Sequence, residues 1–253
     1  MGFFYHIETF IDYLLNPNEY KDRGSMGEQF TYRELRGWFS KRQILRNLYI
    51  PKNNGELTEI DLAVVCRKCI IVVESKNLSG WIYGHEKDIN WTQTLPGYKF
   101  SFYNPIMQNQ THVDSLKPLL TQFPTLPILS LIVFSDRCTL KNISVTSDNV
   151  VVIQRKSFKS YIKKVINKSP NVISKDERNM IISHLSKYSR PDASVRELHL
   201  QQLAAKNAVC PKCRGVLIEK LNRNTNVHFL GCENFPSCKF TTNKYNVICE
   251  RCK

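Results

Sequence analysis

Two charged residues near the end of an apolar run have the types and spacing of a hydrolytic or metal site. Glu74 and Lys76 follow the run 70–73 and lie two positions apart. Because side chains alternate along a strand, both project to the same face of a sheet. Charges at the end of a buried strand cost desolvation energy unless they pair or bind a metal. The pattern therefore predicts a paired or metal-bound carboxylate at a sheet edge.

A tight hairpin would bring more acidic residues to the same place. Residues 66–69 separate two apolar stretches, and a two-residue loop there makes the numbers of opposed residues sum to 135. This register places Asp61 opposite Glu74. It also places Glu59 opposite Lys76.

Opposed carboxylates predict a divalent metal ion. Directly opposed side chains have their Cβ atoms about 5 Å apart. At that distance two carboxylates repel, and one takes up a proton unless a cation lies between them. Mg²⁺, or Mn²⁺ in its place, accepts oxygen ligands from one or two carboxylates together with substrate phosphate. We therefore expect such an ion between Asp61 and Glu74.

These acidic residues, with Lys76, resemble the PD-(D/E)xK nuclease superfamily. Within it, residues 24–117 resemble a NERD (nuclease-related) domain. The matching positions, in family order, are Gly27, Glu28, 57–61, 73–77, Ser79, Gly80, Trp91, Asn104, Pro105 and Gln108. The chain departs from the family pattern at Arg67-Lys68, where a glycine is expected, and at Ser75, where threonine is common. The resemblance implies an α/β fold with a restriction-endonuclease-like mixed sheet flanked by helices.

The resemblance also implies an activity, namely Mg²⁺-dependent hydrolysis of DNA phosphodiester bonds. Asp61 and Glu74 would hold the metal, and Glu28 would add a carboxylate directly or through water. Lys76 would orient the attacking water and counter the charge of the transition state. Gln108 would orient the water or Lys76.

Several alternatives stay open at this point. The acidic residues and Lys76 could form a structural ion pair at a sheet end. Glu28 could be a helix-start carboxylate favoured by the macrodipole. The chain could be a non-catalytic nucleic-acid-binding protein that keeps the nuclease fold, or its substrate could be RNA.

Four cysteines near the C-terminus have the spacing of a zinc site: Cys210, Cys213, Cys232 and Cys238. A short loop presents two thiolates on one side of a turn, and a second pair completes a tetrahedron around Zn²⁺. Residues 208–242 resemble the C-terminal zinc finger of bacterial type I topoisomerases, which implies binding of single-stranded DNA. Basic side chains for phosphates and aromatic side chains for bases are typical of such modules. The candidates are Lys212, Arg214, Lys239 and Lys244 for phosphates, and Phe229, Phe235, Phe240 and Tyr245 for bases.

The charge distribution favours a polyanionic partner. The net charge is +14, yet residues 1–153 carry 16 Lys and Arg against 15 Asp and Glu. Residues 154–253 carry 20 against 7, so nearly all the excess lies in the last hundred residues. We therefore expect DNA to be engaged mainly by the C-terminal half.

The chain shows no membrane or secretory signal. No stretch approaches the roughly 18 apolar residues of a membrane span. The first fifteen residues lack a basic lead and contain Glu8 and Asp12, which is atypical of a signal peptide. We therefore expect a cytoplasmic protein without membrane contact, whose cysteines are thiols or metal ligands.

Hydrophobic patterning predicts an α/β domain followed by a small ribbon. The expected helices are 28–40, 107–120, 157–168 and 174–187, and the expected strands include 43–51, 81–84, 88–93, 98–103, 128–134 and 150–153. We expect three parts: a nuclease-like domain at 1–190, a helical linker at 191–207 and the ribbon at 208–253.

Overall fold

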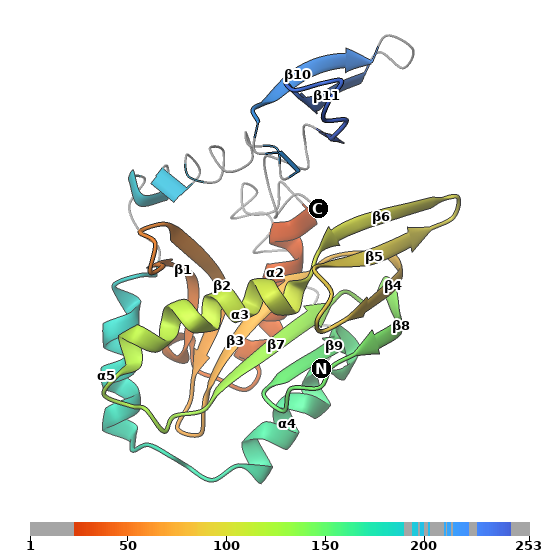
Figure 1. Ribbon diagram of the computed structural model, residues 1–253. Coiled ribbons are helices and arrows are strands. Elements are labelled where there is room, and N and C mark those ends of the chain that lie inside the picture. The colour runs from red at the N-terminus through yellow and green to blue at the C-terminus, as the bar shows by residue number, and fades with distance from the viewer. Residues whose placement is uncertain are drawn as a thin grey trace, which may run out of the picture. The chain divides into compact units, whose positions relative to one another are not determined.

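The computed structural model (Figure 1) describes residues 23–189 and, further on, 194–196, 198–199, 202, 210, 212–213, 215–222 and 227–243. The chain divides into two compact units, Met1–Pro191 and Asp192–Lys253. No helix among the described residues is long and apolar enough to cross a membrane.

A five-stranded mixed sheet forms the centre of the first unit. Its order is β1 (Ile44–Pro51), β2 (Leu57–Val65), β3 (Ile70–Lys76), β7 (Ile128–Phe134) and β9 (Val150–Gln154). The first three strands pair antiparallel, whereas β3, β7 and β9 run parallel. The expected mixed sheet is therefore confirmed. Parallel strands end at one edge, so the residues that follow β3, β7 and β9 gather there.

Helices cover both faces of this sheet. On one face, α3 (Pro105–Leu116) and α5 (Lys175–Ser186) pack against an apolar cluster, and Figure 1 shows α3 crossing this face. On the other face, α2 (Arg23–Arg36) and α4 (Phe158–Lys168) cover a second cluster. The two clusters bury both sides of β3, which explains its continuous apolar run.

A second sheet has the order β6 (Tyr98–Tyr103), β5 (Asn90–Leu95), β4 (Gly80–His85) and β8 (Cys138–Ser144). It packs through Trp91, whose ring stacks on Phe134 of β7 with centroids 6.0 Å apart. Strand β8 was not expected, because its sequence is mostly polar and exposed. It forms by parallel backbone pairing with β4.

The helix that follows β6 begins earlier than expected. Asn104 caps α3 by accepting a hydrogen bond from the Ile106 N–H, and Pro105 fits the first helical position. The Asn104 amide also donates to the backbone carbonyls of His85, Glu86 and Asp88. This cap fixes the start of α3 against the second sheet.

The second unit contains a small three-stranded sheet. Strands β10 (Leu217–Asn222), β11 (Val227–Cys232) and β12 (Thr241–Asn243) pair antiparallel in that order. Its buried centre consists of Leu217 and three of the four cysteines. The expected ribbon of small strands is thus confirmed.

Candidate functional site

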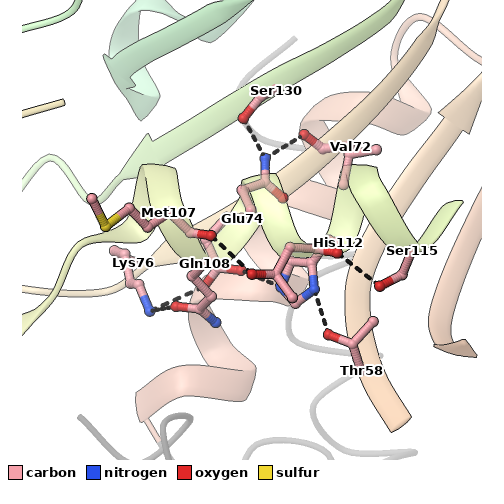
Figure 2. Close-up of polar contacts among 11 residues, drawn as sticks. Thr58, Val72, Glu74, Lys76, Met107, Gln108, His112, Ser115 and Ser130 are labelled. Atoms are coloured by element: carbon pink, nitrogen blue, oxygen red, sulfur yellow. Dashed lines mark hydrogen bonds and ion pairs between the residues drawn. The ribbon is translucent and has the colours of Figure 1, made fainter. Parts of the chain in front are cut away.

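Glu74 is a buried carboxylate that faces a nitrogen on each side. It lies at the end of β3 with 3% of its surface exposed. Its Oε1 is 3.0 Å from Nζ of Lys76, and its Oε2 is 3.4 Å from Nε2 of His112 (Figure 2). Burial raises the pKa of Glu74, but Lys76 and His112 outweigh this effect and hold the pKa below its ordinary value. Glu74 is therefore ionised and fixed in place.

Asp61 and Glu28 add two further carboxylates to this region. Burial raises the pKa of Asp61 well above its ordinary value. The carboxylates of Glu28 and Glu74 raise it further, against a smaller lowering by Lys76. Glu28 itself is 9% exposed and lies on α2. The structure thus brings three acidic residues from α2, β2 and β3 into mutual electrostatic reach.

Helix α3 supplies the polar side chains that border the site. Gln108 accepts a hydrogen bond from Lys76 at 2.9 Å, and His112 lies one turn further along. Nδ1 of His112 is 2.8 Å from Oγ1 of Thr58 in β2. Between these positions, Asn109 donates to the Val72 carbonyl at 3.0 Å and so holds α3 to β3. One face of α3 therefore fixes the charged end of β3.

The expected hairpin register is confirmed where the two strands pair. The ladder between β2 and β3 runs from Val65–Ile70 to Leu62–Val73, and all its pairs sum to 135. Asp61 and Glu74 come next in this register. The substitution of Arg67-Lys68 for the expected glycine leaves the turn in place.

The predicted pairing of Glu59 with Lys76 is wrong. The β2–β3 ladder ends at Leu62–Val73, before it reaches Glu59. On the β1 side, Glu59 pairs with Tyr49, and its side chain accepts a hydrogen bond from Asn47 at 3.0 Å. The Lys76 ammonium contacts Glu74 and Gln108.

The physical cause is an irregularity at Asp61. Asn47, which would pair with Asp61, has a φ of 50°, and the β1–β2 ladder lacks this one pair. Ile60 packs in the same apolar cluster as Ala63, although strict alternation would place them on opposite faces. The alternation of side chains between the two faces of the sheet is therefore interrupted in β2 at Asp61, which lies at the acidic site.

The second candidate site is a cluster of four cysteines: Cys210, Cys213, Cys232 and Cys238. Their sulfur atoms all lie within 4.8 Å of one another. Cys210 and Cys238 are 3.7 Å apart, close to the about 3.8 Å expected for thiolates at the corners of a zinc tetrahedron. The Gly215 backbone N–H and the Asn234 side chain lower the pKa of Cys213 to about 6, which favours the metal-binding thiolate.

Comparison with known proteins identifies both regions. Residues 23–135 match the nuclease-related domain, NERD, and residues 207–247 match the topoisomerase DNA-binding C4 zinc finger. The chain is 32% identical over 190 residues to an uncharacterized protein of Bacillus anthracis. The aligned region covers 74% of this chain and 87% of that protein. The chain belongs to the NERD family. No solved structure matches it.

The predicted residues of the NERD site fall into two groups. Glu74, Lys76 and Gln108 are in direct contact, while Asp61 and Glu28 act on one another through charge. The side chain that sequence reasoning did not assign is His112. Its signal was its position four residues after Gln108, which puts both on one helix face.

The donor set of the NERD site fits a hard divalent cation. Its ligands would be carboxylate oxygens, and the raised pKa of Asp61 reports negative charge that a cation would neutralise. Within the described residues, the three carboxylates are not gathered as closely as the four cysteines. Mg²⁺ keeps several waters and binds one or two carboxylates together with phosphate, so it does not need all three carboxylates as direct ligands.

The ribbon's predicted nucleic-acid residues differ in exposure. Phe235 is 61% exposed, and Nζ of Lys220 lies 5.2 Å from its ring centroid. Phe240 packs against the cysteine cluster, and Phe229 is partly buried. Lys212 and Lys239 are exposed, whereas Arg214, Lys244 and Tyr245 lie outside the described residues. Of the described aromatic candidates, Phe235 is thus the most accessible for stacking.

Proposed function

We propose that this protein is a metal-dependent deoxyribonuclease that hydrolyses phosphodiester bonds at the Glu74 site. The observation that carries the proposal is the buried, ionised Glu74 held between Lys76 and His112 beside Asp61 and Glu28. A structural ion pair alone would not need the two further carboxylates, which raise the electrostatic cost of folding. The site therefore suits a charge-neutralising cofactor better than a purely structural role.

Each residue has a distinct task in this proposal. Glu74 and Asp61 would hold Mg²⁺, with Glu28 reaching it directly or through water. Mg²⁺ would polarise the scissile phosphate and lower the pKa of a bound water. Lys76 donates hydrogen bonds toward the attacking water and counters the charge that develops on the phosphate. Gln108 holds the ammonium of Lys76 at 2.9 Å, which keeps it directed at the site.

Charge and the second unit support DNA as the substrate. Helix α4 carries exposed Lys159, Lys163 and Lys164 and no acidic residue. Strand β9, which precedes α4, ends level with β3 in the sheet. Phe134 of β7 pairs with Lys76 at the end of β3 and with Gln154 at the end of β9. Basic side chains thus begin at the edge of the sheet that carries the site. We also propose that the ribbon holds Zn²⁺ in its cysteine cluster and binds single-stranded DNA.

We propose the domain limits that the sequence predicted: a nuclease domain at 1–190, a linker at 191–207 and the ribbon at 208–253. The linker's described residues, 194–196, 198–199 and 202, are helical. Limited proteolysis tests these limits. Cleavage confined to 191–207 supports them, and early cleavage inside β10 or β11 contradicts them.

The test of activity is a cleavage assay on matched DNA and RNA panels, single- and double-stranded, linear and circular, with and without Mg²⁺. Wild type should cut DNA only with the metal. Glu74→Ala and Lys76→Ala should each lower the rate on the order of a hundredfold or more.

The matched controls are Glu56→Ala and Lys52→Ala. These residues form a partly exposed Glu–Lys pair at 3.1 Å that has no role in the proposed mechanism, so their loss should leave cleavage unchanged. Cutting that survives Glu74→Ala and Lys76→Ala would remove this site from the mechanism. Preferential cutting of the RNA panel would reassign the substrate, and metal-dependent binding without any cutting would favour a non-catalytic role.

A further inference from the structure

The hairpin of β5 and β6 exposes two aromatic rings on one strand face. Tyr98 is 68% and Phe100 is 47% exposed. They lie two residues apart on β6, and their rings are 6.3 Å apart with planes inclined at 21°. The next residue on this face, Phe102, is buried against Trp91. One end of β6 therefore anchors the sheet, and the other presents rings to solvent.

The solvent-exposed side of β6 has no neighbouring strand among the described residues. The sheet order β6-β5-β4-β8 makes β6 an edge, and in Figure 1 the β5–β6 hairpin projects from the sheet. Exposed apolar rings on an edge strand are a liability unless something covers them. A bound partner would cover these rings.

The hairpin lies beside the segment that leaves the acidic site. The Gln93 amide of β5 donates to the carbonyl of Ser79 at 2.7 Å, three residues after Lys76. Gly80 follows with a φ of 78°, and a Cβ there would clash with the carbonyl of Thr94. The backbones are thus in close contact, and the hairpin is tied to the exit of β3.

Charge argues for a polyanion as the occupant. The four strands of this sheet carry Lys99 and Lys141 and no Asp or Glu. Nζ of Lys141 lies 5.0 Å from the ring of the exposed Trp81. Lys99 projects to the opposite face of this edge strand from Tyr98 and Phe100. Positive charge near exposed aromatic rings is a combination with which proteins bind single-stranded nucleic acid.

We propose that Tyr98 and Phe100 form a stacking platform for unpaired bases of the DNA strand that enters the acidic site. This inference rests on the proposed nuclease function and names its substrate class, DNA with a single-stranded segment. The 6.3 Å between the rings is the ordinary spacing of residues i and i+2 on a strand, and it leaves two neighbouring rings on which bases can stack. Aromatic faces accept any base, which predicts little sequence preference.

The first experiment locates the bases directly. The full chain in a Glu74→Gln background is irradiated with a single-stranded oligonucleotide that carries 5-iodouracil, and the cross-linked residues are mapped by mass spectrometry. Cross-links at Tyr98 or Phe100 support the platform. Cross-links confined to other parts of the chain overturn it.

The second experiment measures affinity for that oligonucleotide and for an abasic one of equal length. Tyr98→Leu/Phe100→Leu keeps apolar area but removes the rings, and should weaken single-strand binding at least about fivefold without changing abasic binding. The swap Tyr98→Phe/Phe100→Tyr keeps both rings and should bind like wild type. Met180→Ala, a 57% exposed residue on α5, is the control for a general surface effect.

The outcomes separate this inference from the proposed function. An equal loss of affinity for both oligonucleotides would show that the hairpin acts through charge or folding and not by base stacking, which would overturn the platform. A concentration-dependent dimer in sedimentation that the leucine variant abolishes would assign β6 to a second copy of the chain and overturn the platform. Wild type that never cuts DNA, yet cross-links at the hairpin, would refute the nuclease function and leave the platform standing.

Discussion

Glu74 and Asp61 lie close together but have opposite electrostatic environments. Glu74 has a nitrogen near each oxygen, so its pKa is lowered despite burial. Asp61 lies near two other carboxylates, so its pKa is raised. Neighbouring acids with opposed shifts are typical of sites that handle protons or cations. Glu74 is therefore ionised without a metal ion, whereas a bound metal ion would favour the ionised form of Asp61 most.

Asp61→Asn should stabilise the metal-free protein while it abolishes cleavage. A carboxyl whose folded pKa is raised contributes full stability below its unfolded pKa, near 3.9, and loses it as pH rises through the folded pKa. Asparagine carries no such charge, so the variant's melting temperature should exceed that of wild type at pH 8 by more than at pH 5. Each kcal/mol gained corresponds to about 2–4 °C. Thermal melts with EDTA at both pH values test this, and a lower melting temperature at pH 8 contradicts it.

Mg²⁺ should raise the melting temperature of wild type more than that of Asp61→Asn. The ion would bind the ionised Asp61 of the folded wild type and stabilise it by mass action. Asparagine offers a neutral oxygen, so Asp61→Asn should gain less from the same Mg²⁺ titration. Equal gains for both proteins would show that Asp61 is not a ligand.

His112 is a positioning residue in this proposal, because it touches Glu74 and not the substrate. His112→Ala should lower the cleavage rate about tenfold, and it should also move the acidic limb of the pH–rate profile to higher pH. The reason is that His112 lowers the pKa of Glu74, so its removal lets that pKa rise. Ser115→Ala is the control, since Ser115 lies on the same helix and bonds to the Thr111 carbonyl. A slower enzyme with an unmoved profile would assign His112 a merely structural role.

At the residue scale, the sequence predicted the features that depend on residues close together in the chain. Glu74 and Lys76 share a strand, and the two-residue turn sets the register of the β2–β3 ladder as far as Leu62–Val73, the pair next to Asp61 and Glu74. The contact of His112 with Thr58 and Glu74 depends on how α3 crosses the sheet. That crossing arises from tertiary packing, which sequence periodicity does not specify.

At the element scale, the pairing of β1 with β2 depends on one unusual backbone conformation. Asn47 adopts a φ of 50°, a region that asparagine and glycine tolerate better than other residues. It also donates its amide to Glu59 at 3.0 Å. This irregularity lies opposite Asp61, so it orients a candidate metal ligand.

Substitutions at Asn47 should separate conformation from side-chain bonding. Asn47→Val places a β-branched residue at positive φ and should destabilise the protein on the order of 1–3 kcal/mol, with a matching fall in cleavage at subsaturating Mg²⁺. Asn47→Gly keeps the backbone conformation and should retain most of the stability and activity. Urea unfolding and Mg²⁺ titration of the rate test both. A valine variant as stable as wild type would show that this conformation carries no strain.

The elements that the sequence predicted are those with strong local signals. Strands β6 and β7 match the expected ranges, and α5 begins close to the expected position, where Ser174 and Glu177 form a capping box. Helix α2 begins five residues before the expected 28 and ends at Arg36. The absence of an acidic first turn in α2 removed the usual N-terminal signal. Strand β8 was missed because its order comes from the neighbouring β4.

At the scale of the whole molecule, the chain joins a nuclease-related unit to a ribbon that is too small to fold on an apolar core. The ribbon's buried cluster holds Cys210, Cys232 and Cys238 with Leu217 and little else among the described residues. A core of this size needs a metal to fold. The first unit has its own apolar clusters on both faces of the sheet and does not need the ribbon for stability. The two units should therefore respond differently to loss of zinc.

Cys210→Ser/Cys213→Ser should release zinc, unfold the ribbon and leave the nuclease-related unit folded. We expect the metal content to fall from about one zinc per chain to none, because two of the four thiolates are lost. Single-strand affinity should fall, and its dependence on salt should flatten, because the ribbon's phosphate contacts no longer release counterions. The main thermal transition, which reports the first unit, should stay within about 2 °C of wild type, a shift of less than about 1 kcal/mol. Cys138→Ala, which changes a buried cysteine outside the cluster, should keep the zinc and the salt slope. Retained zinc in the double variant, or collapse of the main transition with it, would contradict the independence of the two units.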